Sequence, residues 1–313
     1  MSAAGSGHGT KAVIAALVAN AAIAAAKFVG FLVTGSSALL AESVHSVADA
    51  GNQGLLLLGG KRAKKDADDA HPFGYGRERY FWAFVVALVL FSLGGLFSLY
   101  EGYHKLAEAS EGGELTSPGV GIGILIFALV AEGFSFRTAI VEANKVRGEQ
   151  SWWRFVRTAK SPELPVVLLE DLGALVGLSL ALVGVVAAAI TGNLLYDALA
   201  TMTIGLLLLV IAVFLVVEMK GLLIGEGGTA TQVRQIRAAL VDGTAITSVI
   251  HLKAAHLGPD ELLVAAKVAV ASGLSVAELA QAIDEAEQRV RAVVPIARAI
   301  YLEPVVLREP VTA

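Results

Sequence analysis

Histidine and carboxylate side chains occur at metal-ligand spacing inside two apolar stretches of this sequence. His45 and Asp49 are four residues apart, so on a helix they lie one above the other on the same face. Glu170 and Asp171 follow one another in a later apolar stretch and offer a second pair. Because Zn²⁺ accepts imidazole nitrogen and carboxylate oxygen at about 2.0 to 2.2 Å in a tetrahedron, two helices that each supply a pair would complete its coordination.

Burial gives these four side chains a free-energy cost that a bound ion would offset. An ionisable residue near the centre of a bilayer costs at least about 2.5 to 3.5 kcal/mol. Polar residues of helical bundles also hydrogen-bond neighbouring helices, and for a single histidine this alternative would suffice. Several ionisable groups in apolar stretches favour a metal ion instead, and since the chain has no cysteine, its ligands must be nitrogen and oxygen atoms.

The elements that would position these residues are long apolar segments. The chain has 313 residues, of which 56% are hydrophobic and only 17% charged. Its mean hydropathy is +0.69, and this composition is typical of a membrane protein. A helix needs about 20 mostly apolar residues to cross a bilayer, so the sequence predicts an α-helical membrane protein with six transmembrane helices. Their windows are Ala12 to Val33, Ala38 to Gly59, Tyr80 to Tyr103, Pro118 to Val141, Val166 to Thr191 and Ala198 to Leu223.

Lysine and arginine are concentrated in two of the connections between these windows. Positive residues in short connections favour the cytoplasmic side, so residues 61–79 and 145–160 are predicted to be cytoplasmic. The opposite connections hold only Lys105. With six spans, both termini are then predicted to be cytoplasmic, and the alanine- and valine-rich composition points to a bacterial inner membrane.

After the last window the sequence takes on the composition of a soluble domain. Residues 1–226 are predicted to form the transmembrane domain, and residues 227–313 a cytoplasmic α+β domain with the order α-β-β-α-β. This order predicts a small two-layer sandwich of ferredoxin-like or metallochaperone-like type, which we interpret as a dimerisation domain. Its elements are a helix over Thr229 to Asp242, strands over Thr247 to Leu257 and Glu261 to Val270, a helix that begins with a Ser275 and Glu278 capping box, and a strand over Ile296 to Leu302.

Two motifs resemble those of a known family. Ser36-Ser-Ala-Leu-Leu-Ala-Glu-Ser-Val-His-Ser-Val-Ala-Asp49 is similar to the second-helix motif of cation diffusion facilitators, a family of zinc and related-metal transporters. His71-Pro-Phe-Gly-Tyr-Gly-Arg77 is similar to the start of that family's third-helix segment. The resemblance covers nearly the whole chain. It implies a homodimer that exchanges metal for protons by alternating access, with His45, Asp49 and Asp171 as metal ligands.

The fifth window departs from the family pattern at one position. Family members usually present His or Asp four residues before the last ligand, where this chain has Val167. The fourth ligand is therefore open between Glu170, Asn52 and water, although Glu170 points about 100° away from Asp171 around the helix. More oxygen ligands suit Mn²⁺ or Fe²⁺, so Zn²⁺ is the first expected cargo, with Mn²⁺, Fe²⁺ and Co²⁺ as alternatives.

Glu132 stands in the middle of the fourth window. It would shuttle protons or orient the metal ligands from outside their coordination sphere. Alternatively, it pairs with a polar helix face such as one that carries Asn20 or Lys27. The sequence leaves both interpretations open.

Two further regions carry potential metal ligands. The loop with Asp68 and His71 would bind a second metal ion or remain a solvated acidic run, and it has Tyr75 where some relatives have another histidine. His251 and His256 are five residues apart on a predicted strand, so they face opposite sides of it. We therefore expect little or no metal in the C-terminal domain.

Several classes of function find no support in the sequence. No HExxH, P-loop or GxSxG motif is present, so we expect neither an enzyme nor a required cofactor. The net charge of −4 gives no reason to expect nucleic acid as a partner. We predict a proton-coupled efflux transporter whose partners are a divalent metal ion, protons and the lipid bilayer. The alternative is a membrane-anchored metal-sensing or scaffolding protein without coupled flux.

Overall fold

The computed structural model describes residues 4–34, 37–110 and 118–306, and the chain forms two compact units. One unit holds Ala4–Arg62 together with Glu78–Lys220, and the other holds Ala63–Arg77 together with the chain from Gly221 onward. Over the described residues the first unit is helical and the second contains the sheet. The segment Ala63–Arg77 therefore groups with the C-terminal fold, although long helices precede and follow it in the chain.

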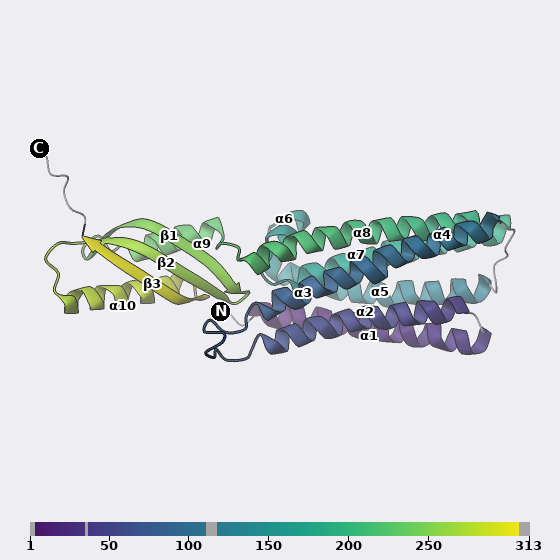
Figure 1. Cartoon of the computed structure of the whole chain (residues 1–313), viewed down its shortest axis with the longest axis horizontal. Helices are drawn as coiled ribbons and strands as arrows, with labels where there is room; N and C mark the ends of the chain where they lie inside the picture. The colour runs from purple at the N-terminus through teal and green to yellow at the C-terminus, as the bar shows by residue number, and fades with distance from the viewer. Residues whose placement is uncertain (1–3, 35–36, 111–117, 307–313) are drawn as a thin grey trace, which may run out of the picture. The chain divides into compact units, whose positions relative to one another are not determined.

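Long helices run side by side in the first unit (Figure 1). Three consecutive elements form one continuous helix of 33 residues, Glu78–Ser110, and a short helix capped by Ser151 lies in the connection between two long ones. In chain order the elements are α1 (Ala4–Thr34), α2 (Ser37–Arg62), α3 (Glu78–Val89), the π-helix η1 (Leu90–Leu96), α4 (Phe97–Ser110), α5 (Pro118–Arg147), α6 (Trp152–Thr158), α7 (Glu163–Thr191) and α8 (Leu195–Ile224).

Five helices of the described chain are long and apolar enough to cross a membrane. They contain five of the six predicted windows, and α2 corresponds to the remaining one. With 26 residues α2 is long enough, but polar residues such as Asp49, Asn52 and Gln53 make it less apolar than a candidate span. The window Ala38 to Gly59 therefore stays a prediction as the sixth transmembrane helix.

Glycines let the continuous helix approach α8 closely. A Cβ atom at Gly95 in η1 would lie 2.5 Å from Cδ2 of Leu209, and one at Gly102 in α4 would lie 2.6 Å from Cγ of Met202. In α8, a Cβ atom at Gly205 would lie 2.8 Å from a backbone nitrogen of α4. Small residues at helix interfaces allow backbones to approach in this way, so a larger side chain at any of the three positions would push the helices apart.

The C-terminal fold has the predicted order α-β-β-α-β over its described residues. Its sheet has the strand order β1-β2-β3, with β1 antiparallel and β3 parallel to the central strand. The second helix connects the two parallel strands and begins with the predicted capping box of Ser275 and Glu278. The elements are α9 (Ala230–Leu240), β1 (Ile246–Gly258), β2 (Glu261–Val270), α10 (Val276–Val293) and β3 (Ala297–Val306).

Aliphatic side chains of both helices and all three strands form one core in this fold. Ile236 of α9 and Val290 of α10 are fully buried against Val264 and Val268 of β2. Because alternate residues of a strand point to opposite faces, both helices cover the same face of the sheet. The other face carries polar side chains, among them an ion pair of 2.7 Å between Lys267 and Glu303.

The segment Ala63–Arg77 contacts the turn between β1 and β2 within the second unit. A Cβ atom at Gly258 would lie 2.8 Å from the Gly76 Cα atom, and one at Gly76 would lie 3.0 Å from the Leu257 carbonyl oxygen. The two backbones are thus in direct van der Waals contact. Only glycine fits on either side without a displacement of the main chain.

Candidate metal centre

Four packed helices, α1, α2, α5 and α7, enclose a group of polar side chains in the first unit. These residues lie within long helices, so partners for their polar atoms must come from neighbouring helices rather than from lipid. The buried members of the group are Asn20 and Lys27 of α1, Ser46, Asn52 and Gln53 of α2, Glu132 and Ser135 of α5, and Glu170 and Asp171 of α7.

Glu170 is held by two amide groups of α2. The Asn52 Nδ2 atom donates to Glu170 Oε1 at 3.0 Å, and the Gln53 Nε2 atom donates to Oε2 at 3.0 Å. The Gln53 side chain also accepts a hydrogen bond of 3.4 Å from Asn20 of α1. Both carboxylate oxygens of Glu170 are therefore engaged in linking α7 to α2. Glu170 could bind a metal ion only by giving up one of these hydrogen bonds.

Asp171 is fully buried and lies against α5. The Ser135 hydroxyl donates to Asp171 Oδ2 at 2.7 Å, and the Glu132 carboxyl group lies within hydrogen-bonding reach of the same side chain. The Ser135 hydrogen bond fixes the orientation of the Asp171 carboxylate through its Oδ2 atom.

Three buried oxygen atoms of this group have no hydrogen-bond partner in the described part of the chain. They are Asn52 Oδ1 on α2, Glu132 Oε2 on α5 and Asp171 Oδ1 on α7. A buried polar atom without a partner costs about 1 to 3 kcal/mol, and native structures contain few such atoms. Amide and carboxylate oxygens are suitable ligands for divalent cations, so a cation bound among the three helices would relieve this cost.

Of the two predicted ligands on α2, the structure describes the side chain of one. Asp49 is half-buried and lies within electrostatic range of Glu132 and Glu170, whereas the side chain of His45 lies outside the described residues. Among the residues that are described, no three His, Asp or Glu side chains lie close enough together to hold a metal ion. The ligand set His45, Asp49, Asp171 and Glu170 therefore remains a prediction.

Ser135 and Gln53 are members of the group that are not among the site residues predicted from the sequence. Each is a polar residue within one helical turn of a carboxylate on its own apolar helix, since Ser135 follows Glu132 by three residues and Gln53 follows Asp49 by four. That spacing places them on the same helix face as the carboxylate. It is the signal that identifies such supporting residues.

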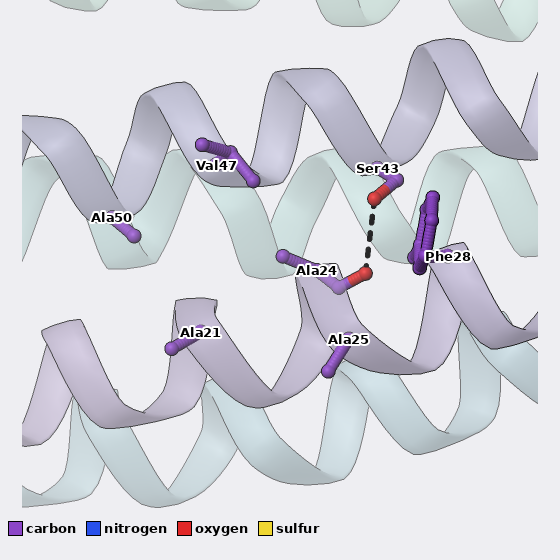
Figure 2. A pocket seen from close by; sticks show the side chains of 7 residues that line it. All are labelled: Ala21, Ala24, Ala25, Phe28, Ser43, Val47 and Ala50. Carbon is purple, nitrogen blue, oxygen red and sulfur yellow. Dashed lines mark hydrogen bonds between the residues drawn. The ribbon is translucent and has the colours of Figure 1, made fainter.

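An apolar groove of about 370 Å³ lies between α1 and α2 (Figure 2). The Ser43 hydroxyl donates to the Ala24 carbonyl at 3.0 Å across it. The rest of the lining is hydrocarbon, so the groove is unsuited to hold a metal ion. The lining residues are Ala21, Ala24, Ala25, Phe28, Ser43, Val47 and Ala50.

In the acidic loop of the second unit, a lysine of the same loop binds the carboxylate of Asp68. Asp68 Oδ2 accepts hydrogen bonds from Lys65 Nζ at 2.8 Å and from the Tyr75 hydroxyl at 2.7 Å. These two donors, Lys65 first, hold the pKa of Asp68 well below its ordinary value. A second metal ion at Asp68 and His71 would have to displace the Lys65 ammonium group.

The histidines of the C-terminal fold face opposite sides of the sheet, as predicted. His251 is exposed, whereas His256 is 1% exposed and its Nδ1 atom lies 3.3 Å from the Gly258 carbonyl oxygen. The two imidazoles are therefore not placed to share an ion.

Residues 13–224 match the family described as the cation efflux transmembrane domain. The chain is 30% identical over 251 residues to the mitochondrial proton-coupled zinc antiporter SLC30A9 of Homo sapiens. The matched stretch covers 79% of this chain and 44% of that protein. It is 30% identical over 254 residues to metal tolerance protein C4 of Arabidopsis thaliana, 80% of this chain and 55% of that protein. The magnetosome protein MamB of Magnetospirillum gryphiswaldense is 26% identical over 273 residues, 87% of this chain and 85% of that protein. The chain thus spans about half the length of the first two relatives.

Proposed function

The chain belongs to the cation efflux, or cation diffusion facilitator, family of membrane transporters, and on that premise we propose that it exports a divalent transition-metal ion in exchange for protons. Zn²⁺ is the first candidate, since the SLC30A9 relatives are named as zinc antiporters. Mn²⁺, Fe²⁺ and Co²⁺ are the alternatives for a site rich in oxygen ligands. The ion is the transported substrate, and we propose no enzymatic reaction.

The observation that carries this proposal is the set of buried oxygen atoms without partners on Asn52, Glu132 and Asp171. The three atoms come from three different helices and belong to one polar group, so an ion among them would be enclosed by the bundle. Ionisable side chains buried among transmembrane helices mark ion pathways and proton relays.

In the proposed site, His45 and Asp49 of α2 and Asp171 of α7 bind the ion directly. Asn52 is the simplest fourth ligand, because its Oδ1 atom lacks a partner while both oxygens of Glu170 accept hydrogen bonds. If Glu170 replaces Asn52 as the ligand, it must first release one of the α2 amides. In either arrangement the site joins α2 to α7.

Exchange with protons follows from competition for the same ligand atoms. A metal ion needs a neutral imidazole and ionised carboxylates, so metal entry expels protons and the return of protons weakens metal binding. If the site opens to one side of the membrane at a time, helices that rock around it carry metal one way and protons the other.

We further propose that α2 is the sixth transmembrane helix and that both termini are cytoplasmic. Lysine and arginine in the connections that precede α3 and follow α5 support this orientation. Residues 227–313 would form a cytoplasmic domain that mediates homodimer formation. In a bacterial inner membrane, the inward proton gradient would then drive metal out of the cell.

Transport in proteoliposomes with an imposed pH gradient tests the proposed function. We expect wild type to show proton flux that depends on Zn²⁺, or on Mn²⁺, Fe²⁺ or Co²⁺ when each is added alone. Asp49→Ala and Asp171→Ala should reduce this flux at least about tenfold, because each removes a charged ligand. Asp284→Ala, an exposed residue of α10, is the control and should transport as wild type does.

Two results would contradict the proposal. Wild-type flux in both Asp49→Ala and Asp171→Ala would exclude the proposed site. Metal binding by the wild type without any flux would favour a metal-sensing or scaffolding protein instead.

A further inference from the structure

Lys27 is a buried lysine inside a helix that is apolar enough to cross a membrane. It lies in the candidate span Thr10–Leu32 of α1 and is 6% exposed. An ammonium group at such depth is costly unless negative charges surround it. Satisfying hydrogen bonds alone would not require a charge, because a neutral amide side chain also donates. The position therefore calls for an explanation of the charge itself.

The ammonium group is anchored beside the predicted ligands of α2. Lys27 Nζ donates a hydrogen bond of 2.9 Å to the Ser46 hydroxyl, and Ser46 lies between His45 and Asp49 in the same helical turn. The hydroxyl also holds the long lysine side chain in one orientation. The positive charge is thus fixed next to the turn that would bind the metal ion.

The same charge acts on a carboxyl group of α5. Lys27 lies within electrostatic range of Glu132, and the Glu132 carboxyl group is within hydrogen-bonding reach of Asp171. Over the described residues, the polar interior thus combines the Lys27 ammonium group with the carboxyl groups of Asp49, Glu132, Glu170 and Asp171. Lys27 offsets part of their negative charge when no metal ion is bound.

We propose that Lys27 is an internal counter-cation of the metal centre, which weakens metal binding and thereby speeds metal release. The inference rests on the proposed transport function. A bound divalent ion is repelled by the fixed ammonium group, and in a low-dielectric interior this repulsion is large. A transporter must bind its cargo loosely enough to release it. Lys27 is therefore a positioning residue that sets affinity, and it is not itself a ligand.

The test compares three substitutions at this position. Lys27→Met removes the charge at similar volume, Lys27→Gln removes it but keeps a donor for Ser46, and Lys27→Arg keeps it. We expect Lys27→Met and Lys27→Gln to lower the Kd for Zn²⁺ or Mn²⁺, measured by titration calorimetry of the full chain in detergent, by on the order of tenfold. In proteoliposomes the same variants should show a lower KM and a lower kcat. Both values should stay close to wild type in Lys27→Arg, which keeps the charge.

The control is Lys105→Met, which removes another lysine of the helical unit. Lys105 pairs with Asp197 at 2.9 Å, and Asp197 is not one of the proposed ligands. We therefore expect the Kd of Lys105→Met for metal to match that of wild type. If Lys27→Met fails to fold, Lys27→Gln carries the comparison, because it keeps the hydrogen bond to Ser46. An unchanged or weaker metal affinity in the neutral variants would overturn the inference.

Failure of this inference can be told apart from failure of the transport function. Suppose that wild type transports metal, that Asp171→Ala does not, and that Lys27→Met and Lys27→Gln have the Kd and KM of wild type. Then only the role proposed for Lys27 is wrong. If wild type neither binds nor transports a divalent ion, the proposed function is wrong, and the inference about Lys27 is overturned with it.

Discussion

Asp171 shows how a hydrogen bond can orient a single carboxylate and leave one of its oxygens open to a metal ion. Ser135 binds one of its oxygens at 2.7 Å and leaves the other buried without a partner. Partners of this kind fix the orientation of a metal ligand, and their removal typically costs about 10- to 100-fold in affinity. In the proposed site that role would fall to the Ser135 hydroxyl group, which links α5 to α7.

Ser135→Ala is expected to raise the Kd for Zn²⁺ by about tenfold, since the Asp171 carboxylate loses the donor that orients it. Titration of the purified chain in detergent measures the change. Ser179→Ala is the matched control, because the Ser179 hydroxyl donates to the Leu175 carbonyl of its own helix. Ser135→Thr retains a hydroxyl and should recover part of the affinity. An unchanged Kd in Ser135→Ala would show that the hydrogen bond does not position Asp171.

The sequence predicts which residues of the site are unusual but not how they are paired. Asp49, Asp171 and Glu132 stand out because each is a carboxylate in an apolar helix. The hydrogen bond between Gln53 and Glu170 joins residues 117 positions apart, and no local pattern encodes it. Such pairs depend on how α2 rotates against α7, which only the packing of the whole bundle determines.

The packing of the continuous element Glu78–Ser110 depends directly on glycine. Gly95 and Gly102 are seven residues apart, and both face side chains of α8 that a Cβ atom would strike. The π-helix η1 contains the first of them, and π segments inside α-helices often mark functional positions. The contact with α8 therefore depends on the absence of side chains in this helix.

Gly102→Val is expected to destabilise the helical unit by about 1 to 3 kcal/mol, because the added side chain meets Met202 of α8. The measurement is the melting temperature of the purified protein in detergent. Gly133→Val in α5 is the control, since a Cβ atom there meets nothing within 4 Å. Equal melting temperatures for the two variants would contradict close packing between α4 and α8.

Element types and approximate bounds are largely predictable, whereas departures from regular geometry are not. The capping box of Ser275 and Glu278 marks the start of α10 correctly, because side chains next to each other in the chain form it. The π-helix has no comparable local signal in Leu90–Leu96. Likewise, the polar residues that make α2 a candidate for metal binding also lower its hydropathy. Hydropathy alone therefore does not identify α2 as a transmembrane helix.

On the scale of the whole molecule, the chain crosses between its two units more than once. The segment Ala63–Arg77 lies between α2 and α3 in sequence but belongs to the unit of the C-terminal fold. Its contact there is the close approach of Gly76 to Gly258. The sequence predicts the segment as a connection on the basis of its charge, but its association with a turn about 180 residues later arises only in the folded chain.

Gly258→Val is expected to detach this segment from the β1–β2 turn, because the new side chain would overlap the Gly76 backbone. Limited trypsin digestion of the full chain in detergent measures the effect, since Lys64 and Lys65 are exposed cleavage sites. Cleavage there should become several-fold faster than in wild type. Ala265→Val, at an exposed position of β2, is the control. Equal cleavage rates in all three proteins would show that the segment is held by other contacts.

The π-helix also determines where the continuous element can lose a residue. A π-helix closes its hydrogen bonds over one residue more than an α-helix does, so a π segment inside an α-helix accommodates one extra residue. Removal of one residue from Leu90–Leu96 should therefore let the segment become α-helix and leave Gly102 facing Met202. Removal of one residue between Phe97 and Gly102 would instead turn Gly102 away from Met202, because each residue of an α-helix advances the chain by about 100°. A single deletion should thus be tolerated in η1 and not in the first turn of α4.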